Sequence, residues 1–189
     1  MEDRLVKNKT ISQGLFNALV FLQVRGISQV ISNTDLPYVP SNVNNDYVIL
    51  KVDPPLIMGG NVQAACLPSA NYLPDTASES KCFTSGWGSV SEYQGTTAKY
   101  LRYMRAPVIP NNQCEWPLTD TKMCAGYTDK HKYVCSGDSG GPLVCNNNGD
   151  AVIAGVVSYG KRCIIGRPDV YARVTTVLNW IENNMVIFH

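Results

Sequence analysis

Residues 135–145, with the sequence CSGDSGGPLVC, constrain this chain more than any other feature. Glycine adopts backbone conformations closed to other residues, so Gly137, Gly140 and Gly141 predict a sharp turn around Ser139. Such a turn leaves the backbone N–H groups of Gly137 and Ser139 free to point at a developing oxyanion. A serine hydroxyl becomes a nucleophile only when it is placed on such a turn and given a base. The alternative is a glycine-rich turn capped by Asp138, but so many constraints in one segment favour the nucleophile.

The rest of the chain from residue 24 onward indicates mostly β-structure. Short runs rich in Val, Ile, Tyr and Thr alternate with turn residues, at 27–31, 47–52, 99–108, 151–159 and 169–174. Regular spacing of strands and turns without helical periods favours a barrel or a sandwich. Only the tail predicts a helix, because Val174, Val177, Leu178 and Ile181 follow the i, i+3, i+4, i+7 pattern.

The seven cysteines predict disulfides. None of them sits in a C-x-x-C pair, which argues against a zinc or thioredoxin-like site, and we expect neither a metal nor a cofactor. Widely spaced cysteines in a chain with 15 Gly and 11 Pro favour an oxidising, extracellular compartment. An odd number leaves one thiol without an internal partner.

Charge and hydropathy argue against nucleic-acid-binding and membrane proteins. The formal net charge of +1 argues against nucleic-acid or anionic-membrane binding, and no apolar run is long enough to span a membrane. The apolar run at 15–22 is short and follows an acidic start, so we interpret it as a buried segment rather than a signal peptide.

Residues 135–145 resemble the nucleophile motif of the chymotrypsin/trypsin-like serine peptidases. Further segments resemble family motifs in the family's order: 44–51 (NNDYVILK), 65–68 (ACLP), 84–88 (TSGWG), 157–160 (VSYG), 168–171 (PDVY) and 180–181 (WI). The resemblance covers about residues 27 to 185. It implies an all-β, chymotrypsin-like double antiparallel β-barrel with an incomplete first barrel and a C-terminal helix. The expected divisions are 1–26 as a non-matching segment, 27–75 as a partial first barrel, 76–173 as the second barrel and 174–189 as helix and tail.

The resemblance also implies roles for individual residues. Ser139 would be the nucleophile of peptide-bond hydrolysis, Asp46 the orienting carboxylate and Ser158 its support, with Gly137 and Ser139 supplying the oxyanion amides. Partners would be a protein or peptide substrate or an inhibitor. The family pairings give three disulfides: Cys82–Cys145, Cys114–Cys124 and Cys135–Cys163. Cys66 is left over, and in many relatives the matching cysteine pairs with a propeptide.

The expected specificity pocket comprises Tyr133, Ser158, Gly160 and Asp169. Trypsin-like relatives carry an aspartate where this chain has Tyr133, and usually a glycine where it has Asp169. Two interpretations stay open. Asp169 moves the negative charge of the pocket to one wall, which would accept basic or bulky side chains. Alternatively, Tyr133 fills the pocket and hydrogen-bonds Asp169, because a buried carboxylate needs a partner.

The family's general base is the main departure from the pattern. The sequence has two histidines, His131 and His189, and neither precedes Asp46 as the family motif requires. Residues 1–26 also lack an Ile-Val-Gly-Gly-type segment whose α-amine would pair with Asp138. We therefore expect this chain to be inactive alone, with residues 1–26 an alternative start on a longer, secreted serine endopeptidase. The alternatives are a non-catalytic homologue that binds a protein through the cleft, and a truncated product without a folded function.

Overall fold

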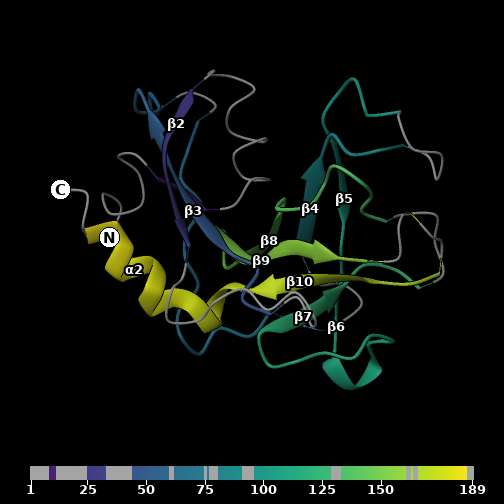
Figure 1. Ribbon diagram of the computed structural model, residues 1–189. Helices are drawn as coiled ribbons and strands as arrows, with labels where there is room; N and C mark the ends of the chain where they lie inside the picture. The colour runs from purple at the N-terminus through teal and green to yellow at the C-terminus, as the bar shows by residue number, and fades with distance from the viewer. Residues whose placement is uncertain are drawn as a thin grey trace.

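The computed structural model describes residues 9–11, 25–32, 44–59, 62–74, 76, 81–90, 96–128, 133–160, 163 and 166–186. Within these residues the chain forms two antiparallel β-sheets and one C-terminal α-helix (Figure 1). The all-β class with a terminal helix, predicted from the sequence, is therefore confirmed.

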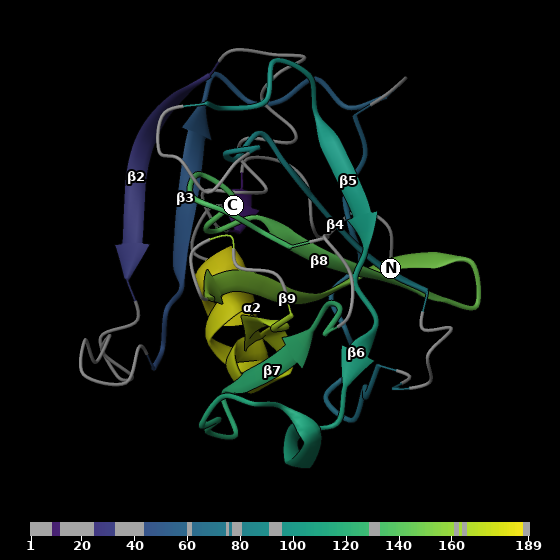
Figure 2. The same cartoon turned by 90° about the vertical axis from the view of Figure 1, so that its right-hand side faces the viewer.

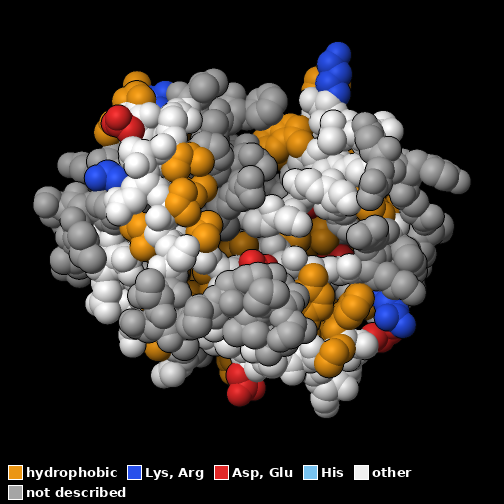
Figure 3. All heavy atoms as spheres, viewed as in Figure 1, with side chains coloured by type: hydrophobic (Ala, Val, Ile, Leu, Met, Phe, Trp, Pro, Cys, Tyr) orange, Lys and Arg blue, Asp and Glu red, His pale blue; other side chains and the backbone are white. Residues whose placement is uncertain are grey.

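The smaller sheet has three strands, in the order β1-β3-β2. They are β1 (Lys9–Ile11), β2 (Gly26–Ser32) and β3 (Val48–Asp53). The central strand β3 buries Ile49, Leu50 and Val52, whereas the edge strand β2 leaves Val30 59% exposed. Figure 3 shows hydrophobic side chains exposed over this part of the molecule.

The larger sheet has seven strands, in the order β5-β4-β8-β9-β10-β7-β6. In chain order they are β4 (Cys82–Gly86), β5 (Arg102–Arg105), β6 (Val108–Ile109), β7 (Lys122–Ala125), β8 (Pro142–Asn147), β9 (Asp150–Tyr159) and β10 (Asp169–Arg173). The two edge strands, β5 and β6, are separated in the chain by Ala106 and Pro107 alone. Because the first and last strands follow one another directly, the sheet curls back on itself toward a barrel (Figure 2).

The C-terminal helix joins the two sheets. A 3-10 turn, η2 (Val174–Val177), leads into α2 (Leu178–Val186). The four apolar positions that predicted the helix are all buried, in a cluster that also contains Ile49 of β3 and Ile153 of β9. The segment starts as a 3-10 turn rather than an α-helix, and no side-chain hydrogen bond caps its beginning. This cluster holds the start of β3 against β9, which positions the residues described below.

Three disulfides lie within the larger sheet or between this sheet and its loops. They are the pairs that the family resemblance implies. Cys82–Cys145 joins β4 to β8, Cys114–Cys124 ties the loop after η1 (Asn111–Gln113) to β7, and Cys135–Cys163 ties the turn before β8 to the loop after β9. Cys66 is the free cysteine and is exposed. Its backbone N–H donates to the carbonyl of Ala151 over 2.9 Å, so this segment is fastened to β9.

Candidate active site

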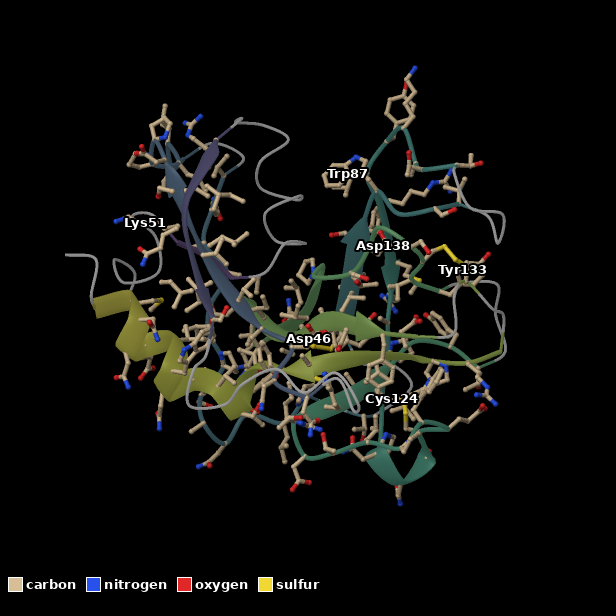
Figure 4. The ribbon with its side chains drawn as sticks, viewed as in Figure 1. Asp46, Lys51, Trp87, Cys124, Tyr133 and Asp138 are labelled. Carbon is tan, nitrogen blue, oxygen red and sulfur yellow. A yellow bond between two sulfur atoms is a disulfide. The ribbon has the colours of Figure 1, made fainter. Side chains whose placement is uncertain are left out.

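Asp46 lies in a turn that is anchored on both sides. The turn passes through Asn45 at φ 55°, a left-handed conformation that asparagine tolerates. Immediately after Asp46, the Tyr47 side chain is buried and its hydroxyl donates to the carbonyl of Arg173 over 2.7 Å. Burial raises the pKa of Tyr47 well above its usual range, so the hydroxyl stays a donor. These contacts hold the Asp46 carboxylate between the two sheets, as Figure 4 shows.

The Asp46 carboxylate takes part in a chain of hydrogen bonds with two other side chains. The Ser158 hydroxyl donates to Asp46 Oδ2 over 2.7 Å, which is the contact expected from the resemblance. Lys122 Nζ donates in turn to Ser158 Oγ over 2.9 Å. Sequence reasoning missed Lys122, because nothing in the sequence around it indicates that this lysine is buried beside Ser158. Burial lowers the pKa of Lys122, and the nearby Asp46 carboxylate opposes that shift.

Ser139 is exposed on the turn that the glycines predict. Gly137 has φ 99°, a conformation that only glycine adopts readily. The turn is fastened to β9 by two hydrogen bonds, from Gly140 N to the carbonyl of Val157 and from Val157 N to the carbonyl of Gly141, each of 2.8 Å. Val157 directly precedes Ser158, the partner of Asp46. Consecutive residues of β9 therefore hold the Ser139 turn and the Asp46 carboxylate.

The N–H groups of Gly137 and Ser139 donate no hydrogen bond within the described part of the chain. Both residues are exposed.

The Asp138 carboxylate stabilises the same turn through hydrogen bonds. Its Oδ1 accepts from Gly88 N over 2.8 Å and its Oδ2 accepts from Cys135 N over 2.9 Å. A Cβ added at Gly86 or Gly88 would overlap this carboxylate, so glycine at both positions makes room for it. In Figure 4, Asp138 lies between the labelled Trp87 and Tyr133.

A cavity of about 450 Å³ opens beside Asp138. Its lining includes Gly86 and Gly88, the apolar side chains of Leu101 and Met104, and Tyr133. Thr84, Ser85, Ser89 and Arg102 also line it, so the cavity combines the carboxylate with polar, basic and apolar side chains.

The residues expected to form a specificity pocket meet in part. Asp169 is buried, its Oδ2 accepts from Val134 N over 3.0 Å, and a Cβ at Gly160 would lie 2.6 Å from its Oδ1. Tyr133 lines the cavity beside Asp138 instead, and no hydrogen bond between the described side chains joins it to Asp169. Burial raises the pKa of Asp169 to about 7, against the hydrogen bond from Val134, which lowers it.

The raised pKa of Asp169 predicts a pH-dependent stability. The unfolded carboxyl releases its proton near the ordinary value of 3.8, while the folded one keeps it to about 7. The folded state therefore binds more protons in this window, and the free energy of unfolding falls as pH rises through it, by at most about 4 kcal/mol. Urea unfolding at about pH 4.5 and about pH 7.5 measures this fall, which Asp169→Asn should largely remove.

Asp150→Asn is the matched control, because Asp150 is exposed at the start of β9. It should leave the difference between the two pH values unchanged. An Asp169→Asn protein with the same pH dependence as the parent chain would show that Asp169 is ionised throughout.

An aromatic wall flanks Ser158. Trp116 meets the ring of Tyr159 edge to face at 5.7 Å, and its indole N–H donates to the carbonyl of Pro168 over 2.8 Å. The Arg167 guanidinium lies 5.5 Å from the Trp116 ring centroid and pairs with Glu115 at 3.0 Å. Sequence reasoning did not single out Trp116, because only the fold brings its loop next to Tyr159.

Both histidines, His131 and His189, lie outside the described residues, and so does most of the range 1–26. The described ranges hold no cluster of three or more His, Cys, Asp or Glu side chains that could bind a metal ion. In the same ranges, no helix is both long and apolar enough to cross a membrane.

The Trypsin family model matches residues 20–181, which include Asp46, Ser139 and Ser158. The chain therefore belongs to the trypsin family of serine peptidases.

Proposed function

We propose that Ser139 and Asp46 are the nucleophile and the orienting carboxylate of an extracellular serine endopeptidase site. The observation that carries this proposal is the attachment of both to consecutive residues of β9, Val157 and Ser158. Membership of the trypsin family and the three disulfides support the reaction class and the compartment.

The geometry supports acyl transfer. A general base would accept the Ser139 proton as its Oγ attacks a peptide carbonyl carbon, and the amides of Gly137 and Ser139 would receive the developing oxyanion. Ser158 occupies Asp46 Oδ2, so the second oxygen of the carboxylate is the acceptor for an imidazole N–H. A partly buried carboxylate in this role stabilises the imidazolium that forms.

We propose that the base is a histidine upstream of Asp46 in a longer form of the protein. In the given sequence both histidines follow Asp46. A peptidase without its base retains only the contributions of binding and the oxyanion amides, so this chain alone would be inactive. The second candidate is a non-catalytic homologue that binds a protein, which the exposure of the Ser139 turn favours.

Specificity would depend on Asp169. Its buried carboxyl near Gly160 would favour a basic or hydrogen-bonding side chain, since Tyr133 lines the cavity beside Asp138 and no hydrogen bond within the described residues joins it to Asp169. That cavity, with Asp138 beside apolar side chains, suits the α-amine and aliphatic side chain of an activated N-terminus.

The test is the intact mass, N-terminal sequence and phosphonate reactivity of the native protein from its source. We expect a chain longer than 189 residues with a histidine upstream of Asp46, labelled by a fluorophosphonate at Ser139. A native protein that begins at Met1 and resists the phosphonate would exclude the peptidase and leave the binding function. The cleavage preference of the labelled form, compared with its Asp169→Ala variant, then tests the role of Asp169.

A further inference from the structure

Lys122 is a buried, ionisable side chain at the start of β7 in the larger sheet. All four residues of β7 are buried, and Lys122 itself is only 1% exposed. A buried ammonium is unfavourable unless charge and hydrogen bonds compensate it. Its contacts in the described structure are the Ser158 hydroxyl at 2.9 Å and the Tyr159 ring, whose centroid lies 5.6 Å from Nζ.

The direction of the hydrogen bonds follows from the chemistry of the groups. A protonated lysine only donates, so Ser158 Oγ accepts from it. Ser158 has a single hydroxyl proton, and an ionised carboxylate only accepts. The charged form of Lys122 therefore leaves one arrangement, in which Ser158 donates to Asp46 Oδ2 over 2.7 Å. A neutral lysine could instead accept from Ser158 and turn its hydroxyl away from Asp46.

The other ionisable groups around Lys122 do not compete for its ammonium. Arg173 on β10 donates from Nη2 to the backbone carbonyl of Lys122 over 2.9 Å. Tyr159 on β9 faces the Lys122 ammonium with its ring rather than with its hydroxyl. The Tyr47 hydroxyl donates to the backbone carbonyl of Arg173. Asp46 is thus the anion to which the Lys122 ammonium is connected.

We propose that Lys122 is a positioning residue for Asp46. The Lys122 ammonium is the buried counter-charge of the Asp46 carboxylate, and it orients the Ser158 hydroxyl toward that carboxylate. This inference rests on the proposed role of Asp46 as the orienting carboxylate. Under this proposal, a residue of the larger sheet compensates the charge on Asp46, whether or not an imidazole is present.

The first test compares the Asp46 carboxyl resonance at neutral pH by carbon-13 NMR of the aspartate carboxyl groups. The charged Lys122 leaves Ser158 to donate to Asp46 Oδ2, so Lys122→Met should move this resonance away from its position in the parent chain. Lys122→Arg keeps the charge and should restore most of the parental position. Lys99→Met, at an exposed lysine beside Tyr100, is the matched control and should leave the Asp46 resonance unchanged. A folded Lys122→Met protein with the parental Asp46 resonance overturns the proposal.

The second test uses the unaltered protein, so it decides the question even if Lys122→Met does not fold. With lysines labelled at Cε, the Lys122 resonance should be that of an ammonium at neutral pH. A neutral Lys122 at neutral pH overturns the proposal. Neither test needs turnover. A native protein that begins at Met1 and resists the phosphonate would therefore contradict the proposed function alone, and an unchanged Asp46 resonance in Lys122→Met would contradict the role of Lys122 alone.

Discussion

The chain of 189 residues is expected to hydrolyse chromogenic peptide amides no faster than its Ser139→Ala variant. The structure positions a serine and an orienting carboxylate, but a serine hydroxyl needs a base to become a nucleophile. Both histidines of the sequence follow Asp46, whereas the family motif places its histidine before the aspartate, and both lie outside the described residues. The measurement is kcat/KM on a panel of substrates that present arginine, lysine or tyrosine before the scissile bond.

The positive control is a form extended upstream to include a histidine motif and processed at its N-terminus. It should exceed the given chain by at least about a thousand-fold, and its own Ser139→Ala variant should return to the level of that chain. Turnover by the given chain that disappears in Ser139→Ala would contradict the prediction and would mean that a base exists in this sequence.

Replacing both Cys82 and Cys145 with alanine should lower the free energy of unfolding by about 4 kcal/mol. This disulfide closes a loop with a sequence separation of 63 between β4 and β8, so its loss restores much freedom to the unfolded chain. A loss of this size is a large part of the stability of a typical domain. Equilibrium urea unfolding under non-reducing conditions measures it.

Two further variants provide the comparison. The Cys114–Cys124 loop has a separation of only 10, and removing that bridge should cause a smaller loss, about 3 kcal/mol. Cys66→Ser, at the exposed unpaired cysteine, should change stability by less than about 0.5 kcal/mol. If both double variants lost the same amount, restriction of the unfolded chain would not be the main source of the stabilisation.

The sequence predicted the parts of the fold that depend on local chemistry. The glycines of residues 135–145 predicted the turn at Ser139, and the apolar stripe from Val174 to Ile181 predicted the terminal helix. The run at 99–108 was expected to be continuous, but the structure divides it into β5 and β6. Pro107 has no N–H to donate to a ladder, and the chain passes there from one edge of the sheet to the other.

Strands and contacts that depend on distant segments were not predictable in the same way. The strand β7 is only four residues long and begins with a lysine, so neither its length nor its composition resembles a buried strand. The link from Lys122 through Ser158 to Asp46 joins three segments that are far apart in the sequence. The separate environments of Tyr133 and Asp169 likewise follow from the path of the chain, which sequence patterns do not determine.

The turn that carries Ser139 is held before any ligand arrives. Gly140 and Gly141, which follow Ser139, are hydrogen-bonded to Val157 on β9, and the carboxylate of Asp138 accepts from the N–H groups of Gly88 and Cys135. In the proposed function, a carbonyl oxygen that binds the amides of Gly137 and Ser139 would therefore meet donors whose conformational entropy was lost when the protein folded. Association at this turn should then lose little chain freedom, which favours the binding of even a short peptide.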